Sequence, residues 1–77
     1  MRATELLRDE AKLKEVLREA ADNCNAKVNV VYWLRKSIFV EAGRGEIVFH
    51  SPNGAKLVLF NLTKEGRKPC VALTWAG

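Results

Sequence analysis

The sequence predicts an α+β fold in which one N-terminal helix packs on a curved antiparallel β-meander of about four to five strands. Three observations support this prediction. Apolar residues recur at helical spacing near the N-terminus, short apolar runs with a period of two fill most of residues 27–75, and glycine or proline separates several of these runs. The chain has 77 residues, the length of one domain, and we assign residues 1–77 to it.

The predicted helix spans residues 4–22. Its apolar positions are separated by three, four and seven residues, so they form one stripe along a helix. The stripe consists of Leu6, Leu13, Leu17 and Ala20, with Cys24 just beyond the helix. Thr4 is the expected N-cap, because its hydroxyl can accept a hydrogen bond from an early backbone N–H. The segment contains neither glycine nor proline, and polar residues that commonly end helices follow it.

The remainder of the chain is expected to form short strands joined by tight turns. The five expected strands are residues 27–34, 38–42, 46–50, 55–62 and 70–75. Two glycines at 43 and 45 indicate one turn, and Pro52 with Gly54 indicates another. Because short connections join antiparallel neighbours, these strands predict a meander.

Both faces of the predicted sheet carry apolar residues. A helix of about 19 residues is about 28 Å long and covers only one face. The sheet therefore either curls around the helix as a half-barrel or leaves its second face to another chain. We expect a homodimer, with Trp33 and Phe39 as interface residues on the second face.

Positive charge is concentrated in the predicted sheet. Residues 1–22 carry five basic and six acidic side chains, a net charge of −1, whereas residues 23–77 carry eight basic and three acidic ones, a net charge of +5. Basic and aromatic residues are interleaved there, a mixture that nucleic-acid-binding sheets use to hold phosphates and stack bases. The candidate nucleic-acid-binding residues are Arg35, Lys36, Arg44, Arg67 and Lys68. Solubility alone would equally account for these charges.

No catalytic or cofactor motif occurs in the chain. His50 is the only histidine, and a lone histidine is more often a surface or packing residue than a catalyst. A dyad of His50 with Cys70 is conceivable across strands, although the spacing gives no support for it. Cys24, His50 and Cys70 lack the paired spacing of a structural zinc site, and no phosphate-binding loop is present. We expect no enzyme activity, no metal and no cofactor.

The two cysteines are interpreted as free thiols. Secreted disulfide frameworks usually contain four or more cysteines, and no secretory signal or membrane-spanning segment is evident. The expected location is the cytoplasm, without a membrane partner. A single Cys24–Cys70 bridge stays open at this point.

One helix followed by an antiparallel meander resembles the layout of cystatin-type folds. The glycine-bearing hairpin motif of cysteine-protease inhibitors is absent, so no inhibitory residues are carried over. The predicted function is a small, non-enzymatic, dimeric binding or regulatory protein that binds nucleic acid through basic turns beside the sheet. The alternatives are a protein-interaction module or small inhibitor that uses an apolar sheet face, and a small nuclease or hydrolase around His50.

Overall fold

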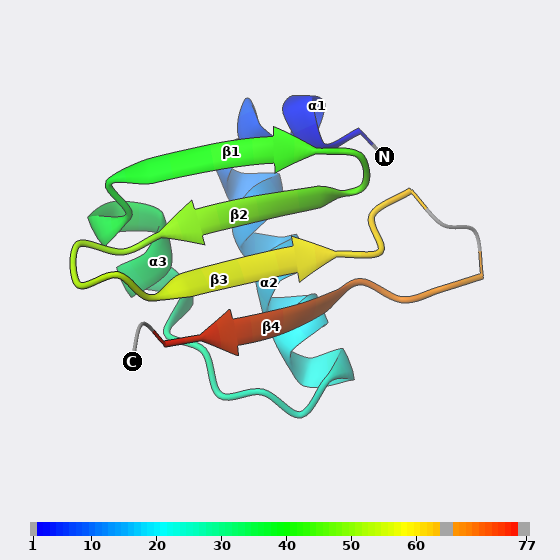
Figure 1. Ribbon diagram of the computed structural model, residues 1–77. Helices are drawn as coiled ribbons and strands as arrows, with labels where there is room; N and C mark the ends of the chain where they lie inside the picture. Colours follow the sequence, from blue (N-terminus) through cyan, green and yellow to red (C-terminus); the bar gives the residue numbers. More distant parts are fainter. Residues whose placement is uncertain (1, 64–65, 76–77) are drawn as a thin grey trace.

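A four-stranded antiparallel sheet with helices on one face makes up the chain, and this confirms the predicted fold class (Figure 1). The computed structural model describes residues 2–63 and 66–75. The helices are α1 (Ala3–Leu7), α2 (Glu10–Asn23) and α3 (Val30–Lys36). The strands are β1 (Phe39–Gly43), β2 (Glu46–His50), β3 (Lys56–Phe60) and β4 (Cys70–Thr74), and they pair in chain order. The sheet does not close into a barrel, so β1 and β4 are its edges.

The expected single N-terminal helix is interrupted between α1 and α2. Asp9 adopts an extended backbone, and its Oδ1 accepts a hydrogen bond from the Lys12 backbone N–H at 3.1 Å, so Asp9 caps α2. The expected Thr4 cap is not formed, since Arg2 is the N-cap of α1 and makes no side-chain cap hydrogen bond. Four of the five residues of the predicted apolar stripe are buried, and the fifth, Cys24, is half-buried. None of the helices in the described residues has the length and apolar character needed to cross a membrane.

The first expected strand, residues 27–34, is wrong, because helix α3 occupies most of it. Asn29 begins this helix by accepting a hydrogen bond from the Tyr32 N–H at 3.1 Å. Val30 and Trp33, three residues apart, are its buried residues, which is helical rather than alternating spacing. The β-branched and aromatic composition of this segment favours a strand, but such propensities depend on packing context.

The strand register separates an inner face, toward the helices, from an outer face. Val40, Phe49 and Leu57 lie side by side on the inner face, and so do Ile47, Leu59 and Val71. All of these except Val40 are buried. The outer face has one row of Phe39, His50, Lys56 and Thr74 and a second row of Glu41, Val48, Val58 and Ala72. Alternation along each strand therefore places the core on the helical side only.

Helix α2 supplies most of the helical contribution to that core. Its side chains at Leu13, Val16, Leu17 and Ala20 are 5% exposed or less, and they belong to one buried cluster with the inner face of the sheet. Leu6 of α1 and Trp33 of α3 extend the same cluster. Burying a leucine or phenylalanine side chain contributes about 1.5–3 kcal/mol, so this two-layer contact is the main source of stability.

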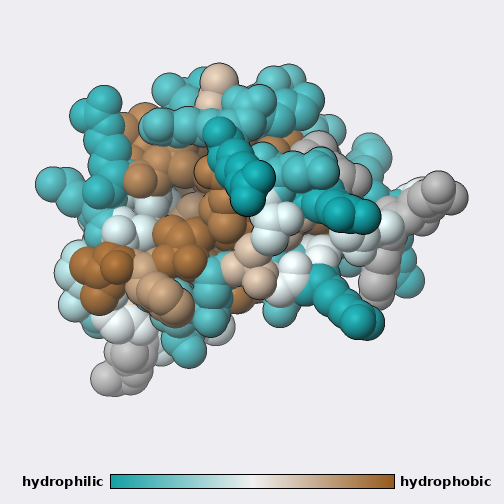
Figure 2. Space-filling view, turned by 90° about the horizontal axis from the view of Figure 1, so that it is seen from above, coloured by the Kyte–Doolittle hydropathy of each residue, from teal (hydrophilic) through white to brown (hydrophobic). Residues whose placement is uncertain are grey.

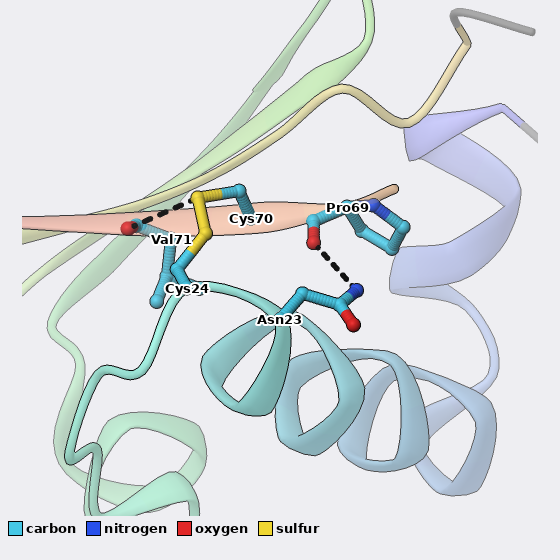
Figure 3. The surroundings of a disulfide bond; sticks show 5 residues. All are labelled: Asn23, Cys24, Pro69, Cys70 and Val71. Atoms are coloured by element: carbon cyan, nitrogen blue, oxygen red, sulfur yellow. Dashed lines mark hydrogen bonds between the residues drawn. A yellow bond between two sulfur atoms is a disulfide. The ribbon is translucent and has the colours of Figure 1, made fainter. Parts of the chain in front are cut away.

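A disulfide between Cys24 and Cys70 corrects the free-thiol interpretation (Figure 3). Cys24 is the C-cap of α2 and Cys70 is the first residue of β4, and their Cα atoms are 5.6 Å apart. The Asn23 side-chain amide also donates a hydrogen bond to the Pro69 carbonyl oxygen at 2.9 Å. Two neighbouring links therefore attach the end of α2 to the start of the edge strand. Sequence spacing could not reveal this pair, because the two cysteines are 46 residues apart.

We expect the double variant Cys24→Ala/Cys70→Ala to unfold more easily. A bridge that closes a loop of this length contributes about 2–4 kcal/mol, mainly by restricting the unfolded chain. For a domain of this size, that loss corresponds to a fall in Tm of roughly 10–25 °C. Thermal denaturation followed by circular dichroism measures the difference. Reductant should lower the Tm of the unsubstituted chain similarly and leave the variant unchanged, whereas an unsubstituted chain insensitive to reductant would contradict a structural role for the bond.

Candidate nucleic-acid interface

The structure divides the five predicted nucleic-acid-binding residues between opposite ends of the sheet. Arg44 lies in the β1–β2 turn, and Arg67 and Lys68 lie in the β3–β4 connection at the same end (Figure 1). Arg35 and Lys36 are in the last turn of α3, which leads into the start of β1 at the other end. A five-residue strand separates the ends by about 16 Å. The five residues therefore do not form one patch.

A backbone hydrogen bond holds the two loops of the first end together. The Leu62 N–H donates to the Gly45 carbonyl oxygen at 3.0 Å, which joins the β3–β4 connection to the β1–β2 turn. Gly45 has a φ of +72° and is buried, so the turn requires a residue that adopts a left-handed backbone. Thr63 lies directly beside it, since a Cβ on Gly45 would be 2.7 Å from the Thr63 Oγ1. Arg44, next to Gly45, is exposed on this fixed turn.

Arg2 adds a further cation at this end, and sequence reasoning missed it. Arg2, Arg44, Thr4 and Thr63 line a hollow of about 370 Å³. Arg44 also borders a smaller hollow of about 210 Å³, together with Glu46 and other residues. Nothing local in the sequence marks Arg2, because only the fold brings the N-terminus beside the β1–β2 turn. We call the four residues Arg2, Arg44, Arg67 and Lys68 the basic end.

The basic end has the chemistry of a phosphate-binding surface. All four side chains are exposed, and none makes a salt bridge with another described residue. Guanidinium groups present several N–H donors in a planar fork that matches phosphate oxygens. Glu46, on the border of the smaller hollow, is the acidic side chain that would repel phosphate there. Such a surface holds a phosphate backbone without reading its sequence.

The two predicted interface residues lie in different environments. Phe39 is 55% exposed at the start of the edge strand β1, on the outer face. Trp33 is only 5% exposed and belongs to the core, so its ring is not offered to a partner. Trp75 is 69% exposed. The two tryptophans differ in exposure because Trp33 lies on the buried side of a helix and Trp75 follows the last residue of β4.

His50 is paired with a carboxylate rather than a thiol. Its Nε2 is 3.0 Å from the Glu41 Oε1, and the Phe39 ring packs against the imidazole with ring centroids 5.2 Å apart. Cys70 pairs with Phe60 at the other end of β3 and its sulfur is in the disulfide, so the conceivable His50–Cys70 dyad does not form. Within residues 2–63 and 66–75, no three His, Cys, Asp or Glu side chains are grouped to hold a metal ion.

We expect Gly45→Ala to lower the free energy of unfolding more than Gly66→Ala does. Both glycines have a positive φ, which costs an alanine about 1–2 kcal/mol. Only at Gly45 would the new methyl group also meet a neighbour, Thr63, whereas nothing lies within 4 Å at Gly66. Chemical denaturation should give a loss of about 2 kcal/mol or more for Gly45→Ala and about 1 kcal/mol for Gly66→Ala. Equal losses would mean that the Gly45–Thr63 contact does not constrain the turn.

Comparison with known proteins gave no match: no family model, no curated protein and no solved structure is significantly similar to this chain.

Proposed function

We propose that this protein binds nucleic acid through the basic end, by contacts with the phosphate backbone. The observation that carries the proposal is the Leu62–Gly45 hydrogen bond, which joins the turn that contains Arg44 to the start of the β3–β4 connection, and Arg67 and Lys68 lie later in that connection. Cations on loops fixed by a rigid sheet need little ordering when a ligand binds. The net charge of +4 supports attraction of a polyanion over longer distances.

Binding of this kind is expected to be sequence-tolerant and steeply salt-dependent. Each phosphate that a cation neutralises releases condensed counterions, so affinity falls as salt rises. Four cations predict up to four phosphate contacts. The protein is proposed to be non-enzymatic, and the hydrolase alternative around His50 rests only on the Glu41 contact on the open outer face.

The test compares two double variants that each remove two positive charges. Arg44→Ala/Arg67→Ala changes the basic end, and Arg35→Ala/Lys36→Ala changes the opposite end. Fluorescence anisotropy with labelled single-stranded and double-stranded oligonucleotides, at several salt concentrations, gives Kd and its salt slope. We expect the first variant to weaken binding at least tenfold. Its salt slope should fall by about two, because two phosphate contacts are lost. The second variant should retain most of the affinity.

Two results would contradict the proposal. Equal losses of affinity in the two variants would mean that binding depends on the net charge of the protein and not on the residues of the basic end. Affinity that does not change with salt would exclude a phosphate-driven interaction. Circular dichroism spectra of both variants serve as the folding control, because all four substituted side chains are exposed.

We also propose that the protein forms a homodimer through its β1 side. Ile38 and Phe39, at the start of this edge, are 70% and 55% exposed, although both side chains are large and apolar. Figure 2 looks onto the β1 side and shows apolar side chains gathered there with polar ones around them. An open edge strand presents backbone groups that can pair with another strand. Antiparallel pairing of β1 with its copy, centred on Phe39, would cover both residues.

The homodimer predicts a specific effect of Phe39→Lys. Lysine on an edge strand opposes pairing, so this variant should sediment at 8.6 kDa whereas the unsubstituted chain sediments at twice that mass. Thr74→Lys is the matched control, because Thr74 is at the other end of the same cross-strand row, on the β4 edge. Analytical ultracentrifugation at tens of micromolar makes the comparison. An unsubstituted monomer, or equal dissociation of both variants, would overturn the proposal.

A cytoplasmic location stays a prediction, and the disulfide bears on it. Disulfides persist in oxidising compartments and are rare in the cytosol, where thiols are kept reduced. In the cytoplasm, Cys24 and Cys70 would therefore be thiols, and the attachment of α2 to β4 would depend on the Asn23–Pro69 hydrogen bond and on packing.

A further inference from the structure

An aromatic-walled pocket lies at the end of the sheet opposite the basic end. Its volume is about 360 Å³, and four segments form it: residues 27–29, helix α3, the turn between β2 and β3, and the end of β4. These segments come together because antiparallel pairing returns the β2–β3 turn and the end of β4 to the same side (Figure 1). The basic end therefore shares no residue with this pocket.

Three aromatic side chains line the pocket, and they differ in how much they are fixed. Trp33 is buried, and its ring meets the Tyr32 ring edge-on, with centroids 5.6 Å apart. Trp75 is 69% exposed, and Leu73 beside it in the lining is 37% exposed. Large apolar side chains at the mouth of a concave site lose that exposure when a ligand enters. Such pockets, apolar with a few polar groups, are the usual sites of small ligands.

The polar side chains of the pocket present mainly hydrogen-bond donors. The Asn29 Oδ1 accepts from the Tyr32 N–H, and the Asn53 Oδ1 accepts from the Ser51 hydroxyl and from a backbone N–H. Both amide oxygens are thus engaged, which leaves their NH₂ groups as the uncommitted donors. Lys27 adds an ammonium group and makes no salt bridge with any described residue. Among the residues that the structure describes, no acidic side chain lines the pocket.

We propose that this pocket binds a flat aromatic group that carries an anion, such as a carboxylate or a phosphate. The ring would lie against Trp75 and Tyr32, since aromatic faces and edges attract one another beyond simple burial. The anion would be held by Lys27 and by the amide donors of Asn29 and Asn53. A free aromatic acid and a nucleotide share this chemistry, and the experiment separates them.

A larger hollow of about 710 Å³ lies between α2 and α3, on the other side of residues 27–29. It contains Asp22 as well as Arg18 and Lys27, and none of the described residues that line it is aromatic. The size of this hollow alone does not specify a ligand. In the smaller pocket, the aromatic side chains and the hydrogen-bond donors together favour one class of ligand, an aromatic anion.

The test is a titration followed by two-dimensional ¹H–¹⁵N NMR, which suits a chain of 77 residues and detects weak ligands. Phenylacetate is the first probe, and adenosine 5′-monophosphate represents the nucleotide source. 2-Phenylethanol removes the charge, and cyclohexylacetate keeps the charge but removes the flat ring. We expect phenylacetate to shift the Trp75 indole and the side-chain amides of Asn29 and Asn53, with Kd of about 1 mM or below. The two controls should bind at least fivefold more weakly.

Substitutions at Trp75 and Lys27 separate the contribution of the ring from that of the anion. Trp75→Ala should weaken phenylacetate at least tenfold, and Trp75→Phe should restore most of that loss. Lys27→Met should weaken phenylacetate about three- to tenfold and leave 2-phenylethanol unchanged. Ile38→Ala, which truncates an equally exposed apolar side chain outside the pocket, should have no effect. The same spectra show whether each variant is folded.

Each outcome decides the proposal. Tighter binding of adenosine 5′-monophosphate than of phenylacetate, at the same pocket residues, supports it with a nucleotide as the source, and the reverse order supports it with an aromatic acid. Equal binding of cyclohexylacetate or 2-phenylethanol would overturn it. Shifts confined to residues outside the pocket, or no shifts with either aromatic anion, would also overturn it.

Discussion

The packing of α2 across one face of the sheet is the interaction on which the rest of the structure depends. The helix has one apolar stripe, and most side chains on the facing side of the sheet are buried in one cluster with it. A sheet of four strands with helices on one side only must leave its other face to solvent or to a partner. This one-sided coverage explains why Val48 and Val58, at the centre of the outer face, are only partly buried.

Strand order then decides where function can reside. In a meander, alternate connections return to the same end, so the β1–β2 turn meets the β3–β4 connection and the β2–β3 turn meets the end of β4. Basic residues of the first pair of connections lie at one end of the sheet, where Arg44 shares a hollow with Arg2, and aromatic residues near the second pair line a pocket. The split between Arg44 and Arg35 follows directly from this topology, although the two residues are only nine positions apart.

Much of this architecture could be predicted from the sequence, because periodicity reports burial. The stripe of α2 and the alternation in β2 and β3 come from contacts that repeat along one element. Helix α3 was missed because its β-branched and aromatic residues favour strands, while the capping side chain of Asn29 and the burial of Trp33 favour a helix. The sites were less predictable. Arg2 and Trp75 depend on contacts between distant parts of the chain, which no local pattern records.

The disulfide lies at the start of β4, and a segment of each proposed site adjoins one of its two cysteines. Cys24 directly precedes the segment that brings Lys27 and Asn29 to the aromatic pocket, and Cys70 follows the connection that carries Arg67 and Lys68. A covalent link at this point fixes where the first segment leaves α2 and where the second enters β4. Without the disulfide, the segment after Cys24 and the β3–β4 connection would each lose one attachment. The first segment is also attached to α3, and the connection is also attached through the Leu62–Gly45 hydrogen bond. The disulfide therefore restricts, at a single point, one segment of each proposed site.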